Sequence, residues 1–291
     1  MHGFNIAQLL VDGVVAGSMY ALMASGISLI WGTMRMLNFA HGEFYMIGGY
    51  TLFFALVALK VHPVIAVGLG LLMTFILGVV VERLIMRWLL LRAEWEMPTL
   101  VATLGLSVFM QNFALRTFGA GDLGLPYVVP GVFRVAGVVL PGQRIAIVLV
   151  AIVAFAAVWS ILRYTKFGIA IRATSQDRDT AVLMGIDFPK VYMLTFGISV
   201  ALAALAATML APIYSVNPWM GQRPMLKAFI VVVFGGLGSL EGAVLGGMAL
   251  GIIESVGVAV VSSEWQDVIA FAILILVLWI RPQGLFGAKE S

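Results

Sequence analysis

The sequence predicts an all-α fold, a polytopic helical membrane protein formed by residues 1–291 as a single transmembrane domain. Hydrophobic residues make up 62% of the 291 and charged residues only 11%, whereas a soluble domain carries about a quarter charged residues. The apolar runs are about 20 residues long, which suits membrane helices rather than the shorter strands of a barrel. Basic residues are concentrated in a few breaks between these runs.

Hydropathy predicts seven continuous spans and one interrupted region. The interrupted region, 226–261, either contributes two short spans or folds as one broken unit with a re-entrant part. We therefore expect eight or nine crossings, and nine would leave the N-terminus outside. The first basic residue is Arg35, so the first span acts as its own insertion signal. The continuous spans are expected near 6–31, 38–60, 63–82, 98–116, 144–162, 191–212 and 265–280.

Basic loops set the predicted orientation, because cytoplasmic loops carry the excess of Lys and Arg. Arg83, Arg87 and Arg92 mark one cytoplasmic segment, and 163–190 is the next. The loop 117–143 and the segment 213–225 are then external. The 117–143 loop is rich in Gly and Pro, and its valines predict a hairpin from Tyr127 to Leu140.

The segment 163–190 holds five basic and three acidic residues, and each charge at the bilayer centre would cost roughly 2.5–3.5 kcal/mol. Within it, Thr174 or Ser175 is expected to cap a helix of about two turns, with Asp177 completing a capping box. Gly185 would end that helix, and Pro189 would delay the next one. The helix is either a plain surface helix or a docking site for a soluble protein.

Two glycine-marked breaks interrupt the apolar sequence, at 36–49 and 234–247. Each places a Glu beside a Gly and a Gly-Gly pair about five residues later, which would suit an internal twofold repeat. One interpretation is that Glu43 and Glu241 cap helix N-termini in the headgroup layer. The other is that the breaks shape and gate a conduit, whose candidate residues are Asn38, His41, Gly42, Glu43, Tyr45, Gly235, Gly236, Gly238, Glu241 and Gly242.

Several classes of chemistry are excluded by the sequence. There is no cysteine, and three scattered histidines predict no metal site. No His-Glu-x-x-His or Gly-x-Ser-x-Gly motif occurs, and no Gly-Lys-Ser/Thr follows the glycine run, so we expect neither an enzyme nor a nucleotide site. The net charge of +3 reflects basic loops and predicts no nucleic-acid partner. We expect the acids near span ends to be interfacial: Asp12, Glu82, Glu254 and Asp267.

Five strings resemble the branched-chain amino acid ABC transporter permease family, on the side of its shorter membrane subunit. The resemblance extends from about residue 6 to Phe286. The strings are Tyr20-Ala21-Leu22 with Gly26, Asn38–Met46, Phe167-Gly168 leading to Arg172-Ala173, Ala181-x-x-x-Gly185-Ile186, and Gly235–Gly242.

The resemblance implies a multi-pass subunit of a bacterial inner-membrane importer. Its partners would be a second permease subunit, homologous or identical, two ABC ATPase subunits and an external solute-binding protein. ATP and Mg would be bound by the ATPases, with no cofactor in this chain. Related permeases dock through Glu-Ala-Ala-x-x-x-Gly, which Asp179-Thr180-Ala181-x-x-x-Gly185 matches in part. The implied docking residues are Arg172, Asp177, Asp179, Ala181, Met184 and Gly185.

The cargo implied by the resemblance is a branched-chain amino acid, with other amino acids, urea and short amides as alternatives. A different class of function is a proton-coupled secondary carrier that uses His41, Glu43 and Glu241. A non-transporting scaffold is the third alternative, against which the polar groups at membrane depth argue.

Overall fold

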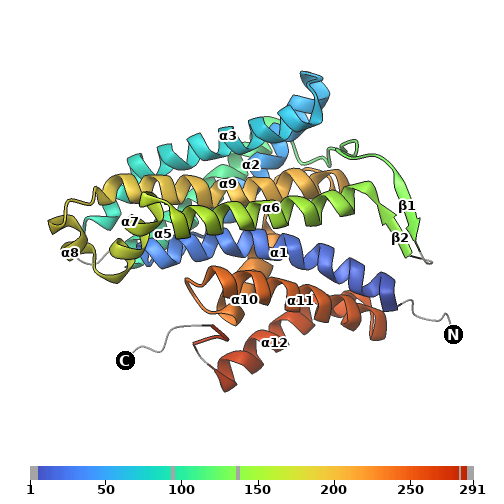
Figure 1. Cartoon of the computed structure of the whole chain (residues 1–291). Helices are drawn as coiled ribbons and strands as arrows, with labels where there is room; N and C mark the ends of the chain where they lie inside the picture. Colours follow the sequence, from blue (N-terminus) through green and yellow to red (C-terminus); the bar gives the residue numbers. More distant parts are fainter. Residues whose placement is uncertain (1–5, 93–95, 136–137, 282, 287–291) are drawn as a thin grey trace.

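Long helices packed side by side make up most of the chain in the computed structural model, which describes residues 6–92, 96–135, 138–281 and 283–286 (Figure 1). The helices are α1 (Ile6–Met34), α2 (His41–Phe53), α3 (Pro63–Val81), α4 (Arg87–Leu90), α5 (Glu96–Phe118), α6 (Gly142–Tyr164), α7 (Lys166–Gln176), α8 (Arg178–Leu183), α9 (Phe188–Tyr214), α10 (Gln222–Gly235), α11 (Leu240–Val260) and α12 (Gln266–Ile280). Short turns of wider or tighter helix adjoin three of them: η1 (Phe54–Ala58), η2 (Glu82–Met86) and η3 (Ser263–Trp265).

Seven helices within the described ranges are long and apolar enough to cross a bilayer. They include every continuous predicted span except 38–60, which corresponds to α2 and η1. The interrupted region forms two helices, α10 and α11. At 14 residues, α10 is about 21 Å long, shorter than a hydrocarbon core of about 30 Å. The all-α multi-pass fold is thus confirmed, while eight or nine crossings and the internal repeat stay predictions.

The helix α1 is the centre of the bundle, between α6 on one side and α11 on the other (Figure 1). In its most apolar 18-residue window, 83% of the residues are buried, against 67% in α9 and 22% in α5. Small residues allow this close packing: a side chain at Gly251 of α11 would collide with the backbone of Gly17. These glycines pack within the chain.

The two ends of the bundle carry different structures. At one end, β1 (Val132–Val135) and β2 (Val138–Pro141) form the predicted hairpin, which pairs Val132 with Pro141. At the other end, α7 packs against the ends of the long helices and α8 projects beyond them (Figure 1). Since the chain reverses direction between successive spans, the segments 117–143 and 163–190 lie at opposite ends of the molecule, as the charge pattern predicts.

Candidate functional site

The first break lies where the chain leaves α1 and turns back into the bundle. The Asn38 side-chain oxygen accepts a hydrogen bond from the Ala40 N–H at 3.1 Å and so shapes the turn that starts α2. His41, which is fully buried, places its ring against Gly26 of α1. Tyr45 is buried one turn later. These polar residues lie inside the protein, as the conduit interpretation requires.

Glu43 points from the first turn of α2 toward α5. Its Oε1 accepts a hydrogen bond of 3.0 Å from the Ser107 hydroxyl, while Oε2 has no hydrogen-bonding partner among the described residues. The residue is only 4% exposed. A buried carboxylate oxygen without a partner is unfavourable, which indicates that this position is kept for something other than stability.

Gly42 allows the N-terminus of a second short helix, α10, to pack against the N-terminus of α2. A side chain at Gly42 would lie 2.7 Å from the carbonyl oxygen of Gly221, the residue before α10. The N-termini of α2 and α10 therefore lie side by side. Beside them, the ring of Phe39 stacks on that of Phe229, with 5.1 Å between the ring centroids. The start of the segment 213–225 lies where it was expected, since Val216 pairs with Leu123 of the 117–143 loop, and the chain then turns inward to Gly221. Pro218 is buried along this inward course, and no pattern in the sequence indicates the close approach of Gly221 to Gly42.

The second break is a tight glycine turn between α10 and α11. Gly236 and Gly238 have positive φ, and the Ser239 hydroxyl accepts from the Gly242 N–H at 2.9 Å as the N-cap of α11. Gly235 and Gly242 pack backbone to backbone. Glu241 is exposed in the first turn of α11, where a helix N-terminus favours a negative charge. Its role in a conduit stays a prediction.

The docking segment forms two helices, and its capping residue differs from the prediction. Asp177 caps α8, since its Oδ1 accepts from the N–H groups of Asp179 and Thr180 at 3.0 and 3.1 Å. Thr174 and Ser175 were predicted to cap but lie in the last turn of α7, because a helix capped by Thr165 already runs through them. The predicted delay after Pro189 is also wrong, because proline fits the first turn of α9.

Some candidate docking residues hold the segment against the rest of the protein, and others are exposed at its surface. Ala181 is 4% exposed, and Arg172 donates a hydrogen bond to the Leu162 carbonyl of α6. Gly185 ends the short helix at φ 86°, a conformation that most side chains disfavour. Leu183 and Met184 are 86% and 80% exposed. Asp179 is exposed as well. The segment thus presents an apolar tip on an anchored support.

The Asp177 cap persists at neutral pH. Hydrogen bonds from the Thr180 hydroxyl and backbone, and then from Asp179, hold the pKa of its carboxyl below the usual value of 3.8. A carboxyl with a lowered pKa contributes its stabilisation above that usual value and loses it only as the pH falls further. The α8 tip is therefore formed throughout the physiological range.

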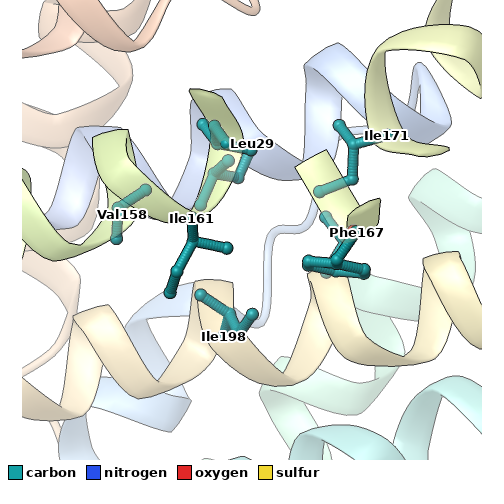
Figure 2. Close-up of a pocket in the computed structure, with 8 residues that line it drawn as sticks. Leu29, Val158, Ile161, Phe167, Ile171 and Ile198 are labelled. Atoms are coloured by element: carbon teal, nitrogen blue, oxygen red, sulfur yellow. The ribbon is translucent and has the colours of Figure 1, made fainter. Parts of the chain in front are cut away.

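Apolar side chains around a small pocket form the contact between α7 of the docking segment and the long helices of the bundle. Figure 2 shows Phe167 and Ile171 of α7 facing Leu29 of α1 and Ile198 of α9, with Val158 and Ile161 of α6 alongside. Side chains packed in this way transmit displacement, because protein interiors are close-packed. Among the described residues, no group of His, Asp or Glu is arranged to hold a metal ion.

Comparison with known proteins identifies the chain's family. A family model described as branched-chain amino acid transport system / permease component matches residues 9–278. The chain belongs to this permease family.

The permease is similar to characterised relatives over nearly its whole length. It is 36% identical to the high-affinity branched-chain amino acid transport system permease protein LivH of Escherichia coli K12, over 97% of this chain and 96% of LivH. It is also 36% identical to BraD of Pseudomonas aeruginosa, over 99% and 97% of the two chains. The ribose import permease RbsC of Escherichia coli K12 is 26% identical, over 94% and 84%. No solved structure matches the permease.

The permease also contains a buried ionic cluster that sequence reasoning missed. Lys227 of α10 contacts Glu254 of α11 at 2.5 Å and Asp267 of α12 at 2.9 Å. Tyr20 of α1 and Gln266 donate to the second Glu254 oxygen at 2.8 and 3.0 Å. Glu254, 1% exposed, is therefore not interfacial as predicted. The sequence feature that could have indicated this cluster is Lys227 itself, a charged residue without an adjacent acidic residue inside the predicted apolar region 226–261.

Glu82 of the permease is likewise buried rather than interfacial. Its side chain is fully enclosed and pairs with Arg87 at 2.9 Å. Arg87 also donates to the Pro189 carbonyl at 3.2 Å, which ties the end of α3 to the start of α9. The wider helical turn η2 aligns the two side chains, since Arg87 follows Glu82 by five residues.

Proposed function

We propose that this permease is the membrane-spanning subunit of an ATP-driven importer of the bacterial inner membrane. It would act with a second permease subunit, two ABC ATPases and an external solute-binding protein. Family membership supports the transport role. The observation that carries the ATP-coupled role is the anchored α8 tip, an exposed apolar pair of side chains at the end of the molecule opposite the hairpin.

In this mechanism, ATP binding by the partners moves α8, and the movement passes to the bundle through α7. The apolar contacts of Phe167 and Ile171 with the long helices support this route (Figure 2). The bundle then opens alternately to the two sides around the α2 and α10 N-termini. The 117–143 hairpin region would receive the loaded binding protein on the outside.

Nine crossings fit this proposal better than eight. Counting α2 with η1 and also α10, successive helices alternate in direction from an external N-terminus to the cytoplasmic Arg281. The basic residues of α4, α7 and α8 then lie on the cytoplasmic side, consistent with their excess of positive charge. The recurring glutamate and glycine pattern of the two breaks supports the internal repeat as a further part of the proposal.

Branched-chain amino acids are the proposed cargo, on the similarity to LivH and BraD. Urea or short-amide import is the alternative, because selectivity in such systems would reside mainly in the binding protein. A proton-coupled carrier is disfavoured because its three candidate groups have separate surroundings. His41 faces Gly26 of α1, Glu43 faces Ser107 of α5, and Glu241 lies beside Trp159 of α6.

Reconstitution tests the energy source. We expect vesicles that contain both permeases, both ATPases and the loaded binding protein to accumulate leucine only with ATP. The permease alone, supplied with a proton gradient and no ATP, should accumulate none. Accumulation by the permease alone would overturn the proposal in favour of the proton-coupled carrier.

Substitutions in the docking segment test the coupling route. Gly185→Val should weaken co-purification of the ATPases, because a β-branched residue resists positive φ, while Gly185→Asn should preserve it, because Asn tolerates that conformation. Met184→Asp should also weaken it. Met97→Asp is the matched control, since Met97 is similarly exposed at the start of α5. Unchanged ATPase binding in both Gly185→Val and Met184→Asp would remove the docking role.

A further inference from the structure

A line of polar groups runs between α2 and α5. On α5, Thr103, Ser107 and Gln111 are spaced four residues apart and so share one helix face. The Thr103 hydroxyl lies 3.4 Å from the Leu37 carbonyl, and the Ser107 hydroxyl donates to Glu43 at 3.0 Å. Further along, Tyr50 of α2 stacks on Phe118 of α5 at 4.4 Å. We call this line of contacts the α2–α5 seam.

Three atoms of the seam are buried without a hydrogen-bonding partner among the described residues. They are Glu43 Oε2, the Gln111 side-chain nitrogen and the Tyr50 hydroxyl. One is a carboxyl oxygen and two are donors. Buried polar atoms in proteins are nearly always paired, either with protein groups or with water, so these three atoms are available to a further partner.

The helix α5 is suited to separate from α2. Only 22% of its most apolar window is buried, and it packs chiefly on α2 and α4. Its outer face is apolar and exposed, as with Val108, Phe109 and Phe113. A helix with few buried contacts opens more easily than the central helices. Displacement of α5 would expose the seam along the length of α2.

We propose that the α2–α5 seam is a transient contact site for the charged groups of the amino-acid cargo. The Glu43 carboxylate receives the ammonium group while the Gln111 amide, one turn beyond Ser107 on α5, donates to the carboxylate. The Tyr50 hydroxyl, seven residues beyond Glu43 on α2, donates to the cargo carboxylate at a later position in its passage. A zwitterion is complementary to this set of one acceptor and two donors. This inference rests on the proposed transport function and assigns Ser107, Gln111 and Tyr50 to the path.

Cysteine labelling tests the site directly, because the chain contains no cysteine. The variants are Ser107→Cys and Gln111→Cys, with Asn112→Cys as the matched control. Asn112 is exposed on α5, and its amide donates to the Val108 carbonyl of its own helix at 2.8 Å. Each variant is assembled with its partners, and its reaction with a cationic, membrane-impermeant methanethiosulfonate is followed with and without ATP.

We expect ATP to accelerate labelling of both seam cysteines about tenfold, the change expected when a minor open state becomes the major one. Leucine delivered by the binding protein should slow that labelling, and the control cysteine should not respond. Seam cysteines whose labelling rate, like that of the control, does not change with ATP in a complex that imports leucine would overturn the inference. Labelling that leucine never slows would overturn it too.

The charge of the reagent tests the role of Glu43. The cationic reagent should react faster than an anionic one at Gln111→Cys, and adding Glu43→Gln should remove that preference. Equal rates for the two reagents with Glu43 intact would overturn the ammonium assignment. If the wild-type complex imports no leucine with ATP, the proposed function itself fails, and this result is known before any labelling.

Discussion

Two buried glutamates of this permease have opposite surroundings. Glu254 is 1% exposed and Glu43 is 4% exposed, yet Glu254 is paired on both oxygens, with Lys227, Tyr20 and Gln266. Glu43 is paired on one oxygen, with Ser107. The two side chains are similarly buried but differ in how many of their oxygens have hydrogen-bonding partners, which indicates that they have different roles. A fully paired acid joins four helices permanently, whereas a half-paired acid remains able to bind something else.

The largest expected effect comes from removing the counter-charge of Glu254. Lys227→Met leaves a buried carboxylate without its cation and should destabilise the folded permease by about 3–5 kcal/mol. The measurement is the thermal unfolding midpoint in detergent. The double variant Lys227→Met, Glu254→Gln should recover part of the loss, because no buried charge remains. An unchanged midpoint in the single variant would show that the cluster is not structural.

Removing the charge of Glu43 should have the reverse pattern, with function lost and the fold retained. Glu43→Gln keeps the shape and the Ser107 contact but removes the anion. A hydrogen bond to a charged group contributes about 1.5–3 kcal/mol, so ATP-driven leucine import should fall more than tenfold. The unfolding midpoint should stay near that of the wild type. Full import by this variant would remove Glu43 from the transport path.

Gln111→Leu distinguishes the seam from the exposed side of α5. The substitution removes an unpaired buried donor, so the midpoint should hold or rise, while import should fall several-fold. One neutral hydrogen bond to the cargo contributes about 1 kcal/mol, or about fivefold in rate. Asn112→Leu on the exposed side should change import little. Equal losses in the two variants would point to a general effect on α5.

Tyr50→Phe should give the smallest change. It deletes the unpaired hydroxyl and keeps the ring stacked on Phe118. Import should fall by a factor of a few at most, corresponding to less than about 1 kcal/mol. The unfolding midpoint should be unchanged or slightly higher. A clear fall in that midpoint would mean that the hydroxyl is paired in the folded protein.

Local sequence patterns were sufficient to predict the spans, because the hydropathy of a span depends only on its own consecutive residues. The ends of α5, α6 and α9 lie within a few residues of the predicted ones. Pairing between distant segments was not predictable in the same way. Lys227 and Glu254 are separated by 27 positions and a turn, and Gly221 meets Gly42 only because residues 215–221 turn inward.

The cap of α8 illustrates a competition that the sequence alone does not resolve. Thr174, Ser175 and Asp177 are all good capping residues, and the choice depends on where the preceding helix ends. Thr165 starts α7 early enough for it to run through residues 174 and 175, which leaves the cap to Asp177. The role of the predicted site residues stays a prediction, and Ser107, Gln111 and Tyr50 of the seam could be placed beside them only from the packing of neighbouring helices.

The turn between α10 and α11 is completed by a distant part of the chain. The N–H groups of Leu285 and Phe286 donate to the carbonyls of Phe234 and Gly235 at 2.9 and 3.0 Å. These residues follow α11 and α12 in the chain and are therefore synthesised after both helices. During biogenesis the Phe234 and Gly235 carbonyls therefore remain without these hydrogen bonds until the C-terminal segment is made. Formation of the two bonds is thus one of the late steps of membrane assembly.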